Sequence, residues 1–140
     1  MAFYPYLFFG GNCREAFTRY QEIFGGDLTL VTAADMPAEE QMLDASPDAI
    51  MHAALTTDDD QLLMGSDDPT TDGFAPVHGM QVNVSVSGVD EARRVFAALA
   101  DGGEVRAPLE PTSFAAAFGM CTDRFGTPWL LTTDEGPDDT

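Results

Sequence analysis

The stretch that decides the fold is Phe24-Gly25-Gly26-Asp27-Leu28, and a related stretch, Asp101-Gly102-Gly103-Glu104-Val105, follows it at an offset of 77 residues. Both place two glycines before an acidic and an aliphatic residue. Glycine accepts the left-handed conformation that often ends a helix. Polar and apolar residues alternate from Asp27 to Thr32, as they do in a half-buried strand. Each stretch therefore predicts a helix that ends at a glycine pair and is followed by a strand.

Apolar residues at helical spacing precede both glycine pairs. Asn12 and Glu15 have the spacing of a capping box and predict the start of the first helix, and Ser87 or Asp90 begins the second. The two apolar stripes are Ala16, Phe17, Tyr20, Ile23 and Phe24 in the first helix, and Ala92, Val95, Phe96 and Leu99 in the second. Each stripe predicts a helix with one buried face.

Strands are predicted around both helices. In the first half we expect them at Phe3–Phe9, Asp27–Thr32, Ile50–Leu55 and Gln61–Gly65, and in the second half at Met80–Val86, Glu104–Pro108, Ala115–Thr122 and Pro128–Thr133. A further short helix is expected around Glu39–Leu43. The order strand, helix, strand, strand, strand thus occurs twice.

This repeat predicts an α+β fold in which two βαβββ modules form curved mixed sheets around a cleft, with the helices on the convex faces. We expect a single domain over residues 1–134. Its first module spans about residues 1–66, a linker about 67–78 and its second module about 79–134. Residues 135–140 form an acidic tail.

The composition excludes several classes of function. The chain has 140 residues, with 24 acidic residues against 6 arginines and a net charge of −18. Nucleic acids and anionic membrane surfaces would repel such a protein, so we expect neither as a partner. The charge indicates either a well-solvated surface or the attraction of a cationic ligand. Cys13 and Cys121 form no disulfide framework, and the apolar run Phe3–Phe9 is too short to span a membrane, which predicts a cytoplasmic protein.

Several further motifs connect the chain to a known family. They are Pro5–Phe9 with Gly11–Ala16, Met51-His52-Ala53, Leu63–Asp67, and Phe118–Met120 running through Asp123–Gly126 to Trp129. Together they resemble the PhnB-like branch of the vicinal-oxygen-chelate superfamily, which includes glyoxalases, bleomycin-resistance proteins and dioxygenases. The resemblance implies a homodimer, but it implies no particular reaction because the fold serves many.

Glyoxalase-type members of that superfamily bind a divalent metal through four side chains. The positions that match them here hold Pro5, Met64 or Ser66, Gln81 and Leu130, of which only Gln81 is an acceptable ligand. The resemblance therefore implies that the usual metal site is lost, and we predict no cofactor. An unusual site built from His52, Gln81 and Glu110 is the alternative, and His78 is expected in an exposed loop.

The remaining candidates are residues suited to an apolar ligand site with a few polar groups. They are Tyr6, Phe8, His52, Gln81, Asn83, Glu110, Phe114, Phe118 and Trp129. We therefore expect a protein that binds a small organic molecule in an aromatic-lined cleft without a metal. The alternatives are a metal-dependent lyase, isomerase or dioxygenase with a non-standard ligand set, and a purely structural or regulatory dimer with no small ligand. No glycine-rich loop of the kind that binds a nucleoside cofactor is present.

Overall fold

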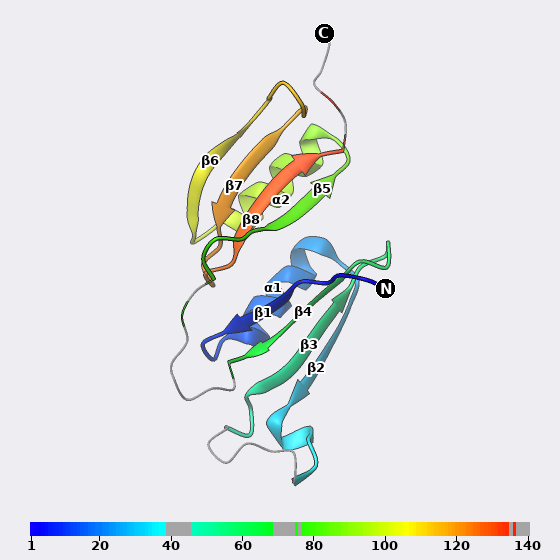
Figure 1. Ribbon diagram of the computed structural model, residues 1–140, viewed down its shortest axis with the longest axis vertical. Coiled ribbons are helices and arrows are strands. Elements are labelled where there is room, and N and C mark those ends of the chain that lie inside the picture. Colours follow the sequence, from blue (N-terminus) through cyan, green and yellow to red (C-terminus); the bar gives the residue numbers. More distant parts are fainter. Residues whose placement is uncertain (39–45, 69–74, 76, 135, 137–140) are drawn as a thin grey trace. The chain divides into compact units, whose positions relative to one another are not determined.

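The computed structural model describes residues 1–38, 46–68, 75, 77–134 and 136 (Figure 1). The chain divides into two compact units, Met1–Ala75 and Pro76–Thr140, and the division falls within the linker predicted at 67–78. In the described residues, no helix is long and apolar enough to cross a membrane. The predicted short helix around Glu39–Leu43 and nearly all of the acidic tail lie outside the described residues.

The first unit holds a four-stranded mixed sheet and one α-helix. Its strand order is β1-β4-β3-β2, with β1 parallel to β4 and the other neighbours antiparallel. Its elements are β1 (Tyr6–Phe9), α1 (Cys13–Phe24), β2 (Asp27–Thr32), the 3-10 turn η1 (Ala33–Asp35), β3 (Ile50–Thr56) and β4 (Leu62–Asp67).

The second unit repeats this topology with the strand order β5-β8-β7-β6, in which β5 and β8 are parallel. Its elements are β5 (Val82–Val86), α2 (Val89–Ala100), β6 (Glu104–Glu110), β7 (Phe118–Thr122) and β8 (Pro128–Thr133). The predicted α+β fold with two βαβββ modules is confirmed.

Each helix covers one face of its own sheet, as Figure 1 shows for α1 and α2. The residues of the two predicted stripes are buried, apart from Phe24 at the end of α1. An aromatic ring of each helix lies directly over a glycine of the sheet. A Cβ added at Gly65 would lie 2.8 Å from the Phe17 ring, and one at Gly119 would lie 2.9 Å from the Phe96 ring. The core of each unit is therefore the layer between helix and sheet, which leaves the opposite sheet face open.

The predicted capping box at Asn12 is wrong, because the Asn12 side chain makes no capping hydrogen bond. The first N–H of α1, at Cys13, instead donates to Oδ1 of Asp67 at 2.9 Å. A capping box does form at η1, where Thr32 and Asp35 exchange hydrogen bonds of 3.3 and 3.0 Å. Hydrogen bonding of the Asp35 carboxylate by the backbone N–H of Thr32, and then by its side chain, lowers the pKa of Asp35.

Several strand ends differ from the prediction because a strand extends only where a neighbour pairs with it. β1 begins at Tyr6, which pairs with Met64, so Phe3 and Tyr4 precede the strand and are exposed. For the same reason β5 begins at Val82, opposite Trp129. In contrast, β6 is longer than predicted and continues to Glu110, because this residue pairs with Phe118.

The glycine pairs lie where expected, and the second glycine of each pair also allows a close contact. Gly25 and Gly26 have φ angles of 74° and 91°. A Cβ at Gly26 would lie 2.2 Å from the Thr56 carbonyl oxygen, and a Cβ at Gly103 would lie 2.1 Å from that of Thr122. Gly26 precedes β2, which begins opposite Thr56 at the end of β3, and Gly103 precedes β6, which begins opposite Thr122 at the end of β7. The close contact therefore occurs at the same place in both units.

Candidate functional site

The open face of the first sheet carries an aromatic cluster on β1. Tyr6 and Phe8 point away from α1 and remain 41 % and 52 % exposed, whereas Leu7 and Phe9 between and after them are buried. The Tyr6 and Phe8 rings have centroids 5.5 Å apart. This cluster exposes apolar ring surface that a ligand or a partner could cover.

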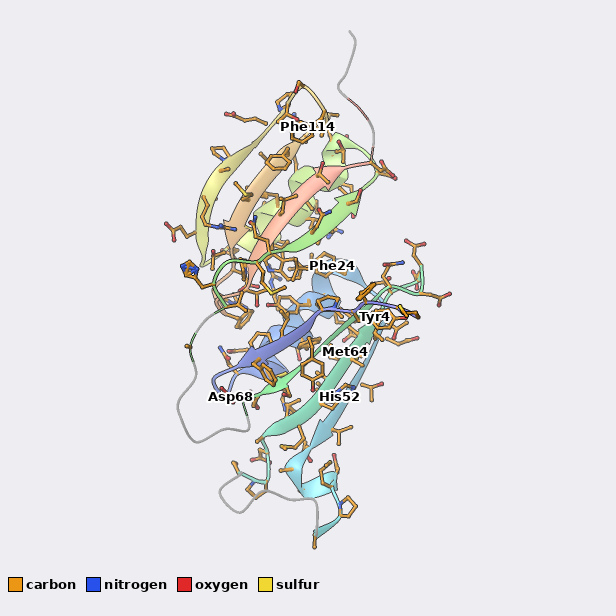
Figure 2. The ribbon with its side chains drawn as sticks, in the orientation of Figure 1. Tyr4, Phe24, His52, Met64, Asp68 and Phe114 are labelled. Atoms are coloured by element: carbon orange, nitrogen blue, oxygen red, sulfur yellow. The ribbon has the colours of Figure 1, made fainter. Side chains whose placement is uncertain are left out.

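His52 of β3 joins this cluster although β4 lies between β3 and β1. Its Nδ1 lies 3.3 Å from the Tyr6 hydroxyl oxygen, and the two rings stack at a centroid distance of 5.8 Å. In the tautomer that is protonated at Nε2, the Tyr6 hydroxyl donates to Nδ1. Figure 2 shows His52 and Met64 over this sheet, and Met64 pairs with Tyr6 in the register. The result is a partly exposed group of rings with one polar pair.

The open face of the second sheet carries three of the other predicted residues. Asn83 and Glu110 are exposed, and Phe118 is half-buried opposite Glu110. The Phe114 ring, 63 % exposed, packs edge-on against Phe118 at a centroid distance of 5.3 Å. The tight turn before Phe118 is closed by Thr112, whose Oγ1 accepts a 3.1 Å hydrogen bond from the N–H of Ala115. Figure 2 labels Phe114 on the second unit.

Trp129 does not lie on this open face. It is 1 % exposed in the core beneath α2, and its Nε1 donates to Oδ2 of Asp123 at 2.8 Å. The other carboxylate oxygen of Asp123 accepts from the backbone N–H groups of Phe125 and Thr127 at 2.9 and 3.0 Å. The motif from Asp123 to Trp129 therefore ties the β7–β8 turn to the core.

Asp67 has an equivalent role in the first unit, and sequence reasoning missed it. This buried carboxylate accepts from Cys13 N–H at the start of α1 and from Ile50 N–H at the start of β3, at 2.9 and 2.8 Å. In the second unit, Thr133 Oγ1 accepts from Ala117 N–H at the corresponding place. The sequence offers one signal for this role of Asp67, because an acidic residue stands at the end of an otherwise mostly apolar strand.

The side chains at the four glyoxalase-type metal positions do not fit a divalent metal. Pro5 and Leu130 have no donor atom, and the position held by Met64 or Ser66 offers only a thioether or a neutral hydroxyl. Gln81 Oε1 already accepts a hydrogen bond from Arg106. In the described residues, no group of three His, Cys, Asp or Glu side chains could hold a metal ion. Within the second unit, Gln81 directly precedes β5, whereas Glu110 lies at the far end of β6, where it pairs with Phe118. The two residues therefore lie at diagonally opposite corners of the sheet.

The two cysteines are buried thiols without a disulfide. Burial, with the nearby Asp67 charge, raises the pKa of Cys13 to about 12. Burial and the Asp123 charge, opposed by Arg106, raise the pKa of Cys121 to about 11. Neither thiol is suited to nucleophilic chemistry at neutral pH, because the thiolate is the reactive form.

We expect the native protein to react with a disulfide reagent such as DTNB at pH 8 at least about a hundredfold more slowly than the unfolded protein, since the raised pKa values deplete the thiolate. Two thiols should react once the chain is unfolded in urea. The raised pKa values also affect stability, because the folded protein holds the thiol protons more tightly than the unfolded chain. The contribution of the two protonated thiols to the free energy of unfolding is full below pH 9 and is lost as the pH rises toward 11 to 12. Fast labelling of the native protein would contradict the burial of both thiols.

Comparisons with known proteins identify a family and solved structures that the chain resembles. Residues 1–132 match the family described as 3-demethylubiquinone-9 3-methyltransferase. The chain is 32 % identical over 136 residues to protein YjdN of Escherichia coli, with 91 % of each chain covered. The structure of PA1353 from Pseudomonas aeruginosa is 40 % identical, covers 99 % of both chains and superimposes with a TM-score of 0.88.

Two further structures extend the comparison. A Bacillus cereus PhnB protein, described as a putative 3-demethylubiquinone-9 3-methyltransferase, is 25 % identical with a TM-score of 0.75 and covers 95 % of this chain and 99 % of its own. A glyoxalase/bleomycin resistance protein/dioxygenase family enzyme from Burkholderia phytofirmans shares the fold, at 14 % identity and a TM-score of 0.60, with 93 % and 95 % of the chains covered.

Proposed function

The chain belongs to the family described as 3-demethylubiquinone-9 3-methyltransferase, a PhnB-like branch of the glyoxalase superfamily, and we propose that it binds a small, flat organic molecule without the usual metal. The observation that carries the proposal is the partly exposed cluster of Tyr6, Phe8 and His52 on the open face of the first sheet. The residues at the family's metal positions are unsuitable metal ligands, which supports binding without a metal.

The cluster has the chemistry of a site for a ring system. Aromatic side chains bind flat ligands by offset or edge-to-face packing, and each ring contact contributes about 0.5–1.5 kcal/mol beyond its buried area. Tyr6 and His52 add one hydroxyl and one imidazole at the side of the cluster, which suits a ligand with few polar groups. Met64 lies next to Tyr6 and adds an adaptable apolar side chain.

The residues of this chain support ligand binding better than methyl transfer from a nucleoside cofactor. Such cofactors are bound where a glycine-rich loop leads from a strand into a helix and leaves the helix N-terminus open. Here the first N–H of α1 is taken by the Asp67 carboxylate. Gly10 and Gly11 do lead from β1 into α1, but they are not part of a longer glycine-rich loop. The pair Gly25-Gly26 follows a helix, and Gly26 packs against the Thr56 carbonyl.

We also propose a homodimer in a reducing compartment, with no nucleic acid or membrane partner. Each chain leaves large apolar side chains exposed, among them Phe114 and Phe8. A second copy that covers part of this surface would bury it, and burial of apolar area stabilises association. The net charge of −18 supports the absence of nucleic-acid and membrane partners, because their dense negative charge would repel the protein.

Replacement of both Tyr6 and Phe8 by alanine should weaken the binding of a neutral bicyclic probe, 2-naphthol, by about tenfold or more, because two ring contacts are lost. Binding is measured by titration in two-dimensional NMR and by the shift of the melting temperature. Phe3→Ala is the matched control, since Phe3 is 92 % exposed and lies outside β1. This control should bind the probe like the unmodified protein.

Two results would contradict the proposed function. One is the absence of any saturable 2-naphthol binding, or binding that is unchanged in the double variant. The other is stoichiometric Zn, Ni, Mn or Fe in protein purified without added ions, together with a measured activity that a chelator removes. The second result would favour the metal-dependent lyase, isomerase or dioxygenase.

A further inference from the structure

We propose that Arg106, positioned by Gln81, is a carboxylate-binding site on the open face of the second sheet. This site goes beyond the proposed function because it uses other residues and requires a negatively charged group on the ligand. The aromatic cluster of the first unit plays no part in the argument.

The hydrogen bond between Arg106 and Gln81 spans the whole second sheet. Arg106 lies in β6 and Gln81 directly precedes β5, and these two strands are the opposite edges of the order β5-β8-β7-β6. Neighbouring strands lie about 4.8 Å apart, so the edges are separated by about 14 Å. An extended arginine and an extended glutamine are together just long enough to meet over that span. Their side chains therefore lie across β7 and β8.

The bridge lies on the face that α2 leaves open. Side chains alternate along a strand, so Gln81 shares a side with the exposed Asn83, while Val82 between them pairs with the buried Trp129. The central strands present Met120 and Leu130 on that open side, where the two residues are register partners. The arginine side chain consequently crosses an apolar floor, while Arg106 itself remains exposed and accessible to a ligand.

The charge of Arg106 is not matched by a carboxylate in the described part of the chain, although acidic residues outnumber arginines by 24 to 6. The helices show the usual arrangement, in which an arginine pairs with an acid three residues earlier or later. These pairs are Arg19 with Glu22, Arg93 with Asp90, and Arg94 with Glu91. Arg106 has Glu104 in its own strand, yet its hydrogen bond goes to the neutral amide of Gln81.

This arrangement suits a carboxylate. A guanidinium has five N–H donors, and Gln81 uses the Nη2 group only, so the rest of the planar fork remains for two parallel hydrogen bonds to a carboxylate. Gln81 holds the guanidinium in place without neutralising its charge. Asn83 lies two residues after Gln81 on the same face of the sheet, and its amide NH2 group provides a further donor.

Benzoate and benzamide test this site because they share a ring and differ in charge. Titration at pH 7, followed by two-dimensional NMR that includes the arginine Nε–H signals, should show benzoate binding at least about tenfold more tightly than benzamide. Arg106→Gln should abolish this preference. The matched control is Arg93→Gln, which changes the net charge equally at an exposed site on α2 and should keep the preference. Melting temperatures check that both variants fold.

Gln81→Leu gives an independent measure of positioning. It keeps the arginine charge but removes the acceptor that holds it, so benzoate affinity should fall by about threefold. Equal affinities of the unmodified protein for benzoate and benzamide would overturn the proposal, as would unchanged benzoate binding in Arg106→Gln or no saturable benzoate binding. Loss of 2-naphthol binding in the Tyr6/Phe8 double variant is a separate result, so the two proposals can fail independently.

Discussion

Replacing Asp67 by alanine should destabilise the protein by about 3 kcal/mol or more, because two buried backbone N–H groups would lose a charged acceptor. Cys13 N–H and Ile50 N–H both donate to this carboxylate, which itself is buried. The carboxylate also lies at the N-terminus of α1, where the helix dipole favours a negative charge. One side chain thus joins the starts of α1 and β3 to the end of β4.

The effect is measured as the free energy of unfolding in urea, followed by far-ultraviolet circular dichroism. The stability of Asp67→Asn should fall between those of the unmodified protein and Asp67→Ala. Its amide oxygen can replace one acceptor, but its NH2 group faces the second backbone N–H donor. Asp59→Asn removes the same charge from an exposed turn, and in a chain of net charge −18 it should be neutral or slightly stabilising. An Asp67→Ala variant as stable as this control would show that the two hydrogen bonds contribute nothing.

Asp67 and Asp123 also explain why motifs can identify a family without revealing its chemistry. Both residues lie in stretches that resemble the PhnB-like branch, and both are buried carboxylates bonded to backbone N–H groups. The resemblance at these positions reports how the chain folds. The same motifs also contain Tyr6, Phe8, His52 and Phe118, which lie on the open sheet faces, so a motif match alone does not separate residues that shape the fold from candidate ligand-binding residues.

The local features of the fold could be predicted because neighbouring residues determine them. The stripes of α1 and α2 and the alternation in β2 depend on residues a few positions apart. The start of α1 could not be predicted in this way. Asn12 has a capping side chain, but Asp67, 54 residues away, makes the hydrogen bond to Cys13. Strand ends were inaccurate for the same reason, since they depend on distant partners.

The candidate site was predictable to the extent that alternation places Tyr6 and Phe8 on one side of β1. The sequence could not distinguish an aromatic ring on an open face from one in the core, and Trp129 lies in the core. The contacts of His52 with Tyr6 and of Arg106 with Gln81 depend on strand order, because each crosses at least one intervening strand. Only the three-dimensional arrangement reveals them.

The glycine pairs give a second large effect, and their variants separate backbone conformation from close contact. Gly103→Ala should destabilise by about 3 kcal/mol or more, since its Cβ would lie 2.1 Å from the Thr122 oxygen, a backbone atom that cannot move away cheaply. Gly26→Ala combines the same clash with a positive φ and should cost at least as much. At Gly25 nothing lies within 4 Å of an added Cβ, but its φ of 74° and ψ of −166° are a conformation that essentially only glycine adopts. Gly25→Ala should therefore cost about 1–3 kcal/mol.

Urea unfolding of the three alanine variants measures these differences, and the fluorescence of Trp129, the single tryptophan, follows the second unit that contains Gly103. If conformational freedom alone explained the repeated glycine pair, Gly25→Ala would be as harmful as Gly26→Ala, and Gly103→Ala would be mild. We expect the reverse order, because the first glycine ends a helix and the second lets the next strand approach the Thr56 or Thr122 carbonyl. The pair is then repeated because both units need that approach to align β2 with β3 and β6 with β7.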